Sequence, residues 1–282
     1  MNFSKLLLIF KWQHLVLGLL ILLNVVVISV SDISDSRWIR LISTVLFFAY
    51  FLKFSSKLNV FILVVLVFMV LRDISIQYYE EPLGHMAFLI FGVLAYGILI
   101  IERLPKLKDI RISKMTLLIS LILISANTYT LHILINMLEY HFGSAAHIIV
   151  FFTYGALMMI MTFTAVSYNY IYNSTRSLVF VFLAIGFLVS DITSLFAYYF
   201  EVDICYYLER ISYLIGLSFT VHYGLSIRIQ HVEREDRRIM DTAEINDTEV
   251  LYIDETTSGR AGEYSKEDEK ASLYTFIKAR KS

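Results

Sequence analysis

Eight long apolar runs, bordered by charged or turn-forming residues, dominate the sequence. A helix of ~20 apolar residues crosses the ~30 Å hydrocarbon core of a bilayer, and most of these runs approach that length. A water-soluble protein has no core large enough to bury so many of them. We therefore predict an all-α fold, a polytopic membrane helix bundle with about eight transmembrane helices. The runs lie near residues 13–31, 38–54, 58–79, 83–101, 115–138, 146–172, 176–200 and 204–227.

The composition supports this class and excludes others. Apolar residues make up 57% of the chain, and charged residues make up only 17%. The net charge of −1, with no interleaved basic and aromatic residues, predicts no nucleic-acid partner. Cys205 is the single cysteine, so no internal disulfide can form. We find no metal-ligand spacing and expect neither a metal site nor a cofactor.

Two of the runs are ambiguous. The first follows a basic start, as in a signal peptide, but it is long and no small-residue cleavage site follows it, which favours an uncleaved span. The second has only the twelve residues "LISTVLFFAYFL" between Arg40 and Lys53. Arg40, Lys53 and Lys57 can extend it if their charged ends reach the membrane surfaces. Without it the count is seven and the topology changes.

Charge asymmetry between the loops predicts the orientation. With eight spans, one side carries most of the Lys and Arg, including five in "ERLPKLKDIRISK" (residues 102–114), whereas the opposite loops are mostly acidic or neutral. Basic loops stay in the cytoplasm, so we expect both termini there. Residues 1–227 then form the membrane domain. Residues 228–282 carry ten Lys/Arg and thirteen Asp/Glu with no long apolar run, which predicts a largely disordered cytoplasmic tail.

Ionisable residues inside the apolar runs are the functional candidates, because their charges are costly in lipid. They are Arg72, Asp73, Asp191, Glu209 and Arg210. Asp73 lies 16 residues beyond Lys57, and Asp191 lies 15 residues beyond Arg176. At ~1.5 Å per residue, both carboxylates are ~23 Å from the cytoplasmic border. We expect Glu209 and Arg210 at a similar level, with Asn127, His132 and His85 as possible neighbours.

Two carboxylates at one depth admit more than one role. Burial and mutual repulsion can leave one protonated as a general acid while the other stays ionised, as in glycosidases. A proton-coupled carrier can use the same pair as a relay. In a purely structural role, Asp73 pairs with Arg210 or Arg72 and holds helices together. The residue spacing alone does not decide between these roles.

Four stretches follow one another in an order that resembles the lysoplasmalogenase (YhhN-like) family of eight-helix membrane proteins. They are "RDISIQYYEEPLGHMAFLIFGVLAYGILI", "VFFTYGALMMIMTFTAVSYN", "FLAIGFLVSDITSLFAYYF" and "YYLERISYLIGLSF". The clearest match is the motif Gly186, Phe187, Ser190, Asp191, and Asp73 matches a motif on an early span. The resemblance covers roughly residues 58–226 and excludes the tail. Arg72, Arg210 and the Gly92–Tyr96 segment depart from the family pattern.

The resemblance implies hydrolysis of the vinyl ether bond of lysoplasmalogens to a fatty aldehyde and a glycerophospho-alcohol. Asp73 and Asp191 are then the catalytic acid/base pair, and no metal or cofactor is needed. Arg72 or Arg210 is expected to bind the phosphate of the lysolipid substrate, with Ser190, Tyr207 and Glu209 as further pocket residues. A proton-coupled carrier and a non-enzymatic membrane sensor or scaffold remain the alternatives. Membrane lipids are the expected surroundings, and the sequence does not define an oligomeric state.

Overall fold

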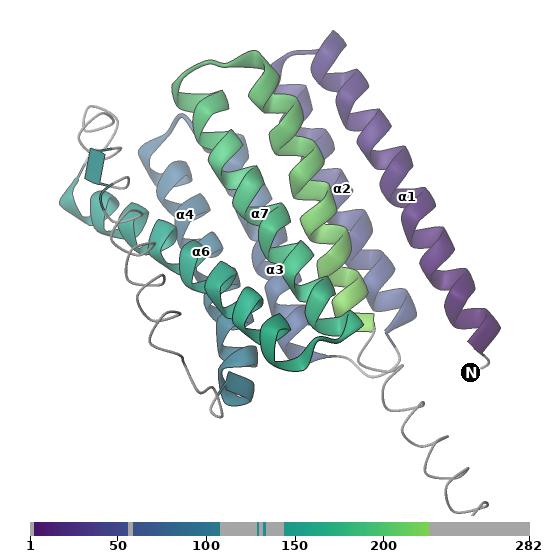
Figure 1. The fold of residues 1–282 in the computed structure, drawn as a ribbon. Coiled ribbons are helices and arrows are strands. Elements are labelled where there is room, and N and C mark those ends of the chain that lie inside the picture. The colour runs from purple at the N-terminus through teal and green to yellow at the C-terminus, as the bar shows by residue number, and fades with distance from the viewer. Residues whose placement is uncertain (1–2, 56–58, 108–128, 130–131, 134–143, 226–282) are drawn as a thin grey trace, which may run out of the picture. The chain divides into compact units, whose positions relative to one another are not determined.

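Apolar helices that run alongside one another make up the structure, a computed structural model (Figure 1). It describes residues 3–55, 59–107, 129, 132–133 and 144–225, with side chains from Trp12 onward. These residues belong to one compact unit, Met1–Arg228. The helices are α1 (Phe3–Val30), α2 (Ile33–Phe54), α3 (Val60–Ser75), α4 (Pro82–Arg103), α6 (Ala145–Tyr172) and α7 (Thr175–Tyr199), with the 3₁₀ helices η1 (Ile76–Tyr78) and η2 (Leu104–Leu107). A further helix covers residues 203–225.

The predicted helical class is confirmed for the described residues, which contain helices and no strand. Five helices are long and apolar enough to cross a membrane, namely α1, α3 with η1, α4 with η2, α6 and α7. The chain is therefore a membrane-embedded, multi-pass protein. α2 is not among the five and carries Asp35, Arg37, Arg40 and Lys53. The predicted run at 115–138 and the tail at 228–282 lie outside the described residues, apart from three positions.

Helix ends follow local sequence signals. The Ser144 side chain accepts a hydrogen bond from the backbone of His147 at the start of α6. Ser174 and Ser177 form a capping box at the start of α7. Asn173, between these helices, has a left-handed backbone conformation with φ 36°, which asparagine tolerates well. Together these residues make the tight connection that sets α6 against α7.

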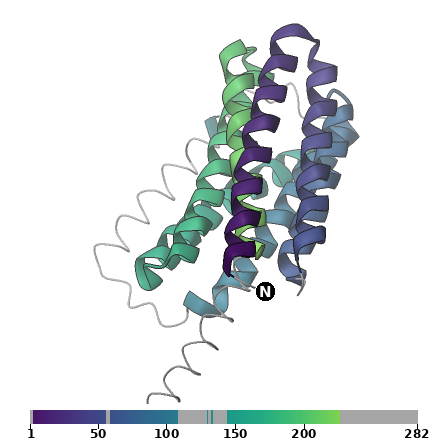
Figure 2. The same ribbon diagram turned by 90° about the vertical axis from the view of Figure 1, so that its right-hand side faces the viewer.

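The helices that carry the candidate residues lie in the interior. α3 packs against α4, α4 against α6, and α2 against both α1 and α3. α1 lies on the outside of the bundle (Figure 2), and many of its apolar side chains are exposed, as expected for a surface in contact with lipid. α7 and the 203–225 helix touch closely, because a Cβ on Gly186 would lie 2.8 Å from the Gly216 Cα. This contact brings Asp191 and Glu209 into the same interior.

Candidate functional site

Asp73 lies on the buried side of α3, where three side chains hydrogen-bond its carboxylate. Arg40 Nε donates to Oδ1 at 2.8 Å. Tyr213 and Thr44 both donate to Oδ2, at 2.7 and 2.5 Å. All four side chains have an exposed fraction of 0%. The carboxylate is thus enclosed between α2, α3 and the 203–225 helix.

Glu209, on the 203–225 helix, shares Arg40 with Asp73. Arg40 Nη1 donates to Glu209 Oε1. On the other side of Glu209, Arg210 Nε lies 3.6 Å from Oε2. Arg210 Nη2 donates to Ser36 Oγ on α2 at 3.0 Å. Two carboxylates therefore compete for one arginine, and a second arginine is close to one of them.

Asp191, on α7, has a separate arginine. Arg72 Nη2 donates to Asp191 Oδ1 at 2.5 Å, and the Tyr96 hydroxyl donates to Oδ2. Arg72 Nη1 also donates to the Tyr96 hydroxyl at 3.1 Å. The Arg72 guanidinium lies 4.3 Å from the centroid of the Phe88 ring. Asp191 and Asp73 thus have matching surroundings, with one arginine and one tyrosine hydroxyl on each carboxylate.

We call six of these side chains the buried charge network: Arg40, Arg72, Arg210, Asp73, Asp191 and Glu209. Its two halves are joined through Arg72 and Asp73, which are neighbours on α3. Phe187 also lies between the halves, with its ring centroid 6.0 Å from those of both Tyr96 and Tyr213. Three arginines face three carboxylates, so the network is neutral when all six are ionised. Such pairing offsets the cost of burying each charge, and removal of one partner leaves the other uncompensated.

Asp191 contacts Arg72, the residue directly before Asp73, so the two aspartates lie in the same part of the bundle. Their predicted common depth in a membrane stays a prediction. Ser190 is 1% exposed, but its Oγ has no hydrogen-bond partner in the described part of the chain. The Tyr207 hydroxyl lies 3.3 Å from Ser29 Oγ on α1, apart from the aspartate contacts.

Of the other possible neighbours, only His85 and His132 lie in the described part of the chain. His132 is exposed, and Asn127 lies outside the described residues. His85 lies near the end of the bundle, where its Nε2 is 2.9 Å from the Tyr199 hydroxyl.

Arg40 is the main residue that the sequence reasoning misplaced. It was expected to mark a membrane border and reach the surface, but it is fully buried and binds Asp73 and Glu209. The suggested structural pairing of Asp73 with Arg210 or Arg72 is also wrong, because the arginine that binds the Asp73 carboxylate is Arg40. An arginine at the border of an apolar run is the available signal, but its position fits a surface-directed side chain equally well.

Several nitrogen atoms of the network lack a hydrogen-bond partner in the described part of the chain. They are Arg40 Nη2, Arg72 Nε, and Arg210 Nε and Nη1. Arg210 has the most nitrogen atoms without a hydrogen-bond partner, because only its Nη2 donates a hydrogen bond. Guanidinium groups bind phosphate oxygens through such paired donors. Arg210 is therefore the better placed of the two predicted phosphate-binding arginines.

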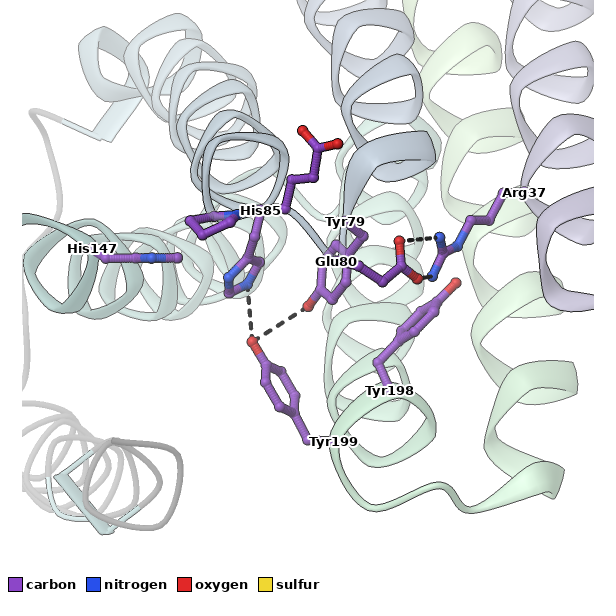
Figure 3. A pocket seen from close by; sticks show the side chains of 9 residues that line it. Arg37, Tyr79, Glu80, His85, His147, Tyr198 and Tyr199 are labelled. Carbon is purple, nitrogen blue, oxygen red and sulfur yellow. Dashed lines mark hydrogen bonds and ion pairs between the residues drawn. The ribbon is translucent and has the colours of Figure 1, made fainter. Parts of the chain in front are cut away.

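A pocket of about 220 Å³ opens at the end of the bundle nearest these residues (Figure 3). Its lining comes from α2, the η1–α4 turn, and the facing ends of α6 and α7: Arg37, Tyr79, Glu80, Glu81, Pro82, His85, His147, Tyr198 and Tyr199. Arg37 donates two hydrogen bonds to Glu80, at 2.9 and 2.6 Å. The hydrogen bond from Arg37 lowers the pKa of Glu80. Figure 3 shows Tyr79 and His85 directed at the Tyr199 hydroxyl.

The pocket is connected to the buried charge network by direct packing. Arg37 lies one turn before Arg40 on α2, and Ser36 accepts the hydrogen bond from Arg210. On the other side, the Tyr79 ring packs edge-on against the Phe88 ring, with 5.5 Å between centroids. The Arg72 guanidinium lies over the Phe88 ring. Residues that line the pocket are thus neighbours of residues that contact the network, although no residue of the network itself lines the pocket.

Among the described residues, no group of three His, Cys, Asp or Glu side chains is close enough together to hold a metal ion. No family model matches this chain, and no curated protein or solved structure matches it either. The resemblance to the lysoplasmalogenase family therefore rests on the sequence motifs alone.

Proposed function

We propose that this protein is a membrane-embedded hydrolase that cleaves the vinyl ether bond of lysoplasmalogen-type lysolipids. The observation that carries the proposal is that Asp73 and Asp191 both lie inside apolar helices, each bound by one arginine and one tyrosine hydroxyl. Charges buried in membrane helices are rarely kept without a function. The motif around Asp191 and the nearby pocket support the same assignment.

The reaction needs only proton transfer and water. A carboxyl group donates a proton to the β-carbon of the vinyl ether, and the neighbouring carbon becomes an oxocarbenium ion. Water adds to that carbon and gives up a proton to a carboxylate, which leaves a hemiacetal. The hemiacetal then breaks its bond to the glycerol oxygen, yielding an aldehyde and the free alcohol. Carboxylates that can exchange protons and stabilise a cation fit these steps.

The charge balance of the network suggests how substrate binding acts on the carboxylates. The network holds three arginines and three carboxylates. A lysolipid phosphate that binds Arg210 would add negative charge to this balanced group. Glu209 is the nearest carboxylate to Arg210, and Arg40 connects Glu209 to Asp73. Substrate binding would thereby change the charge around Asp73, one of the two proposed acid/base residues.

The proposal includes eight spans with both termini in the cytoplasm. Five described helices are long and apolar enough to span, and the basic residues at 102–114 supply the orientation. α2 is the weakest candidate, but a span with buried Arg40 is reasonable where its charge is paired inside the bundle. The 203–225 helix and the run at 115–138 complete the count.

The test is aldehyde release from a purified lysoplasmalogen by the protein in detergent or vesicles. The wild type should release aldehyde, and Asp191→Asn and Asp73→Asn should not. Asp35→Asn is the matched control, because Asp35 is exposed at the start of α2, outside the network. A wild type with no turnover on any lysoplasmalogen would reject the proposal.

Arg40 favours a proton-coupled carrier as the second candidate. It contacts two carboxylates from different helices, so movement of one helix can change which carboxylate it neutralises. Such an exchange couples proton binding to conformational change. Proton uptake by vesicles in the presence of a lysolipid or another solute, without aldehyde release, would favour this function.

A further inference from the structure

A second group of charged residues, one of them fully buried, lies at the opposite end of the bundle from the pocket. Glu102 and Arg103 end α4, and Arg176 begins α7. Tyr168 of α6 and Tyr223 of the 203–225 helix pack beside them. We call Glu102, Arg103 and Arg176 the Arg103 cluster. None of these three residues belongs to the proposed catalytic network.

Aromatic rings hold Arg103 in place. Its guanidinium carbon lies 4.5 Å from the Tyr223 ring centroid, 4.6 Å from that of Tyr168 and 5.3 Å from that of Phe180. The residue has an exposed fraction of 0%. Stacking of this kind occupies the faces of the guanidinium and leaves its in-plane N–H groups for hydrogen bonds.

Those in-plane donors are mostly unused. Arg103 Nη2 donates to Glu102 Oε1 at 2.9 Å, but Arg103 Nε and Nη1 have no hydrogen-bond partner in the described part of the chain. Arg176 Nε also has none there. Buried donors without acceptors are costly, so a group with several acceptor oxygens would stabilise this site.

The charge of the cluster is also unbalanced. Both arginines share one carboxylate: Arg176 Nη2 lies 3.9 Å from Glu102 Oε1, beside the 2.9 Å contact from Arg103. Among the described residues, the two arginines of the cluster face the single carboxylate of Glu102, whereas the buried charge network has three arginines and three carboxylates. The Arg176 side chain is 11% exposed and that of Glu102 is 10% exposed, so this side of the cluster is slightly accessible, whereas Arg103 is fully buried.

We propose that the Arg103 cluster binds a phosphate group between Arg103 and Arg176. Phosphate offers several anionic oxygens and accepts paired hydrogen bonds from guanidinium groups. The cluster lies where membrane-spanning helices end, which is the level of lipid headgroups. The phosphate can belong to a lipid headgroup or be free in solution, since both present the same oxygens. This site is independent of the proposed hydrolysis.

The test measures thermal unfolding of the full-length protein in a phosphate-free, non-ionic detergent. Three probes are added: inorganic phosphate, short-chain phosphatidic acid, and diacylglycerol, which lacks the phosphate. A shift with both phosphate compounds would identify a general phosphate site. A shift with phosphatidic acid alone would identify a lipid headgroup site. Equal shifts with phosphatidic acid and diacylglycerol, or no shift with any probe, would overturn the proposal.

Two variants give opposite expectations. Arg176→Gln removes charge and donors and should weaken phosphate binding by about tenfold or more, as expected for loss of a charged hydrogen bond. Glu102→Gln removes the competing carboxylate and should strengthen binding. A purely structural ion cluster predicts no gain for Glu102→Gln, so unchanged or weaker binding in that variant contradicts the proposal. Lys53→Gln is the control, because it removes an exposed cation at the end of α2 and should leave binding unchanged.

Discussion

Arg72 and Asp191 form an ion pair of 2.5 Å between α3 and α7, with side-chain exposures of only 1% and 5%. The residues are 119 positions apart in the sequence. The pair therefore fixes how two distant spans meet, and it also holds one of the two aspartates proposed to transfer protons. A structural role and a catalytic role can be separated only by variants that keep the charge balanced.

The first prediction concerns stability. Asp191→Asn leaves Arg72 buried without its carboxylate and should destabilise the fold by about 3–5 kcal/mol. Replacing both members, as Asp191→Asn with Arg72→Met, removes the uncompensated charge and should recover most of that loss. Thermal unfolding in detergent measures both variants. A double variant no more stable than the single one would show that the pair is not coupled as described.

The second prediction concerns the contact between α7 and the 203–225 helix. Gly186→Ala should destabilise the protein by about 1–3 kcal/mol through overpacking, because the added Cβ would lie 2.8 Å from Gly216 backbone atoms. Gly97→Ala is the matched control within α4, since nothing lies within 4 Å of its Cβ position. The control should be neutral or stabilising by up to ~1 kcal/mol, as alanine favours helix. Equal effects of the two changes would argue against the close helix contact.

The sequence predicted the helical membrane class, because the hydrophobic length of a helix is a local property. It could not predict the partners of the aspartates. Arg40 stands near the edge of a short run, where a surface-directed arginine and a buried one have the same spacing. Only the packing of α2 against α3 decides that Arg40, rather than Arg72 or Arg210, binds Asp73. Tyr213 and Thr44 were missed for a similar reason, since hydroxyl groups are common in membrane helices.

The third prediction uses the pocket. The hydrogen bond from Arg37 lowers the pKa of Glu80, whose ordinary value is 4.5. A depressed pKa in the folded state gives stability that is present above pH ~4.5 and is lost as the pH falls through the lowered value. Glu80→Gln should therefore reduce stability near neutral pH by a small amount, since the carboxylate is largely exposed. The difference in Tm from wild type should shrink below pH 4.5, and a difference independent of pH would contradict this account.

The fourth prediction concerns orientation. A reporter fused after residue 240 should give a cytoplasmic signal, because the basic residues at 102–114 favour a cytoplasmic location for that side of the bundle. A second reporter in the turn after η1, at Glu80–Glu81, should give the external signal. An external signal after residue 240 would mean that the number of spans is odd, with α2 the first span to reconsider.

The most direct measurement of the central claim is aldehyde release from a lysoplasmalogen, made on variants whose folding has been verified by thermal unfolding. Wild type and Asp35→Asn should both release aldehyde. Asp73→Asn should lose about 100-fold or more of this activity, as expected when a general acid or base is removed. The charge-balanced variant Asp191→Asn with Arg72→Met should fold and show the same loss, because restored stability does not restore proton transfer. Wild-type turnover in that folded double variant would contradict the catalytic role of Asp191.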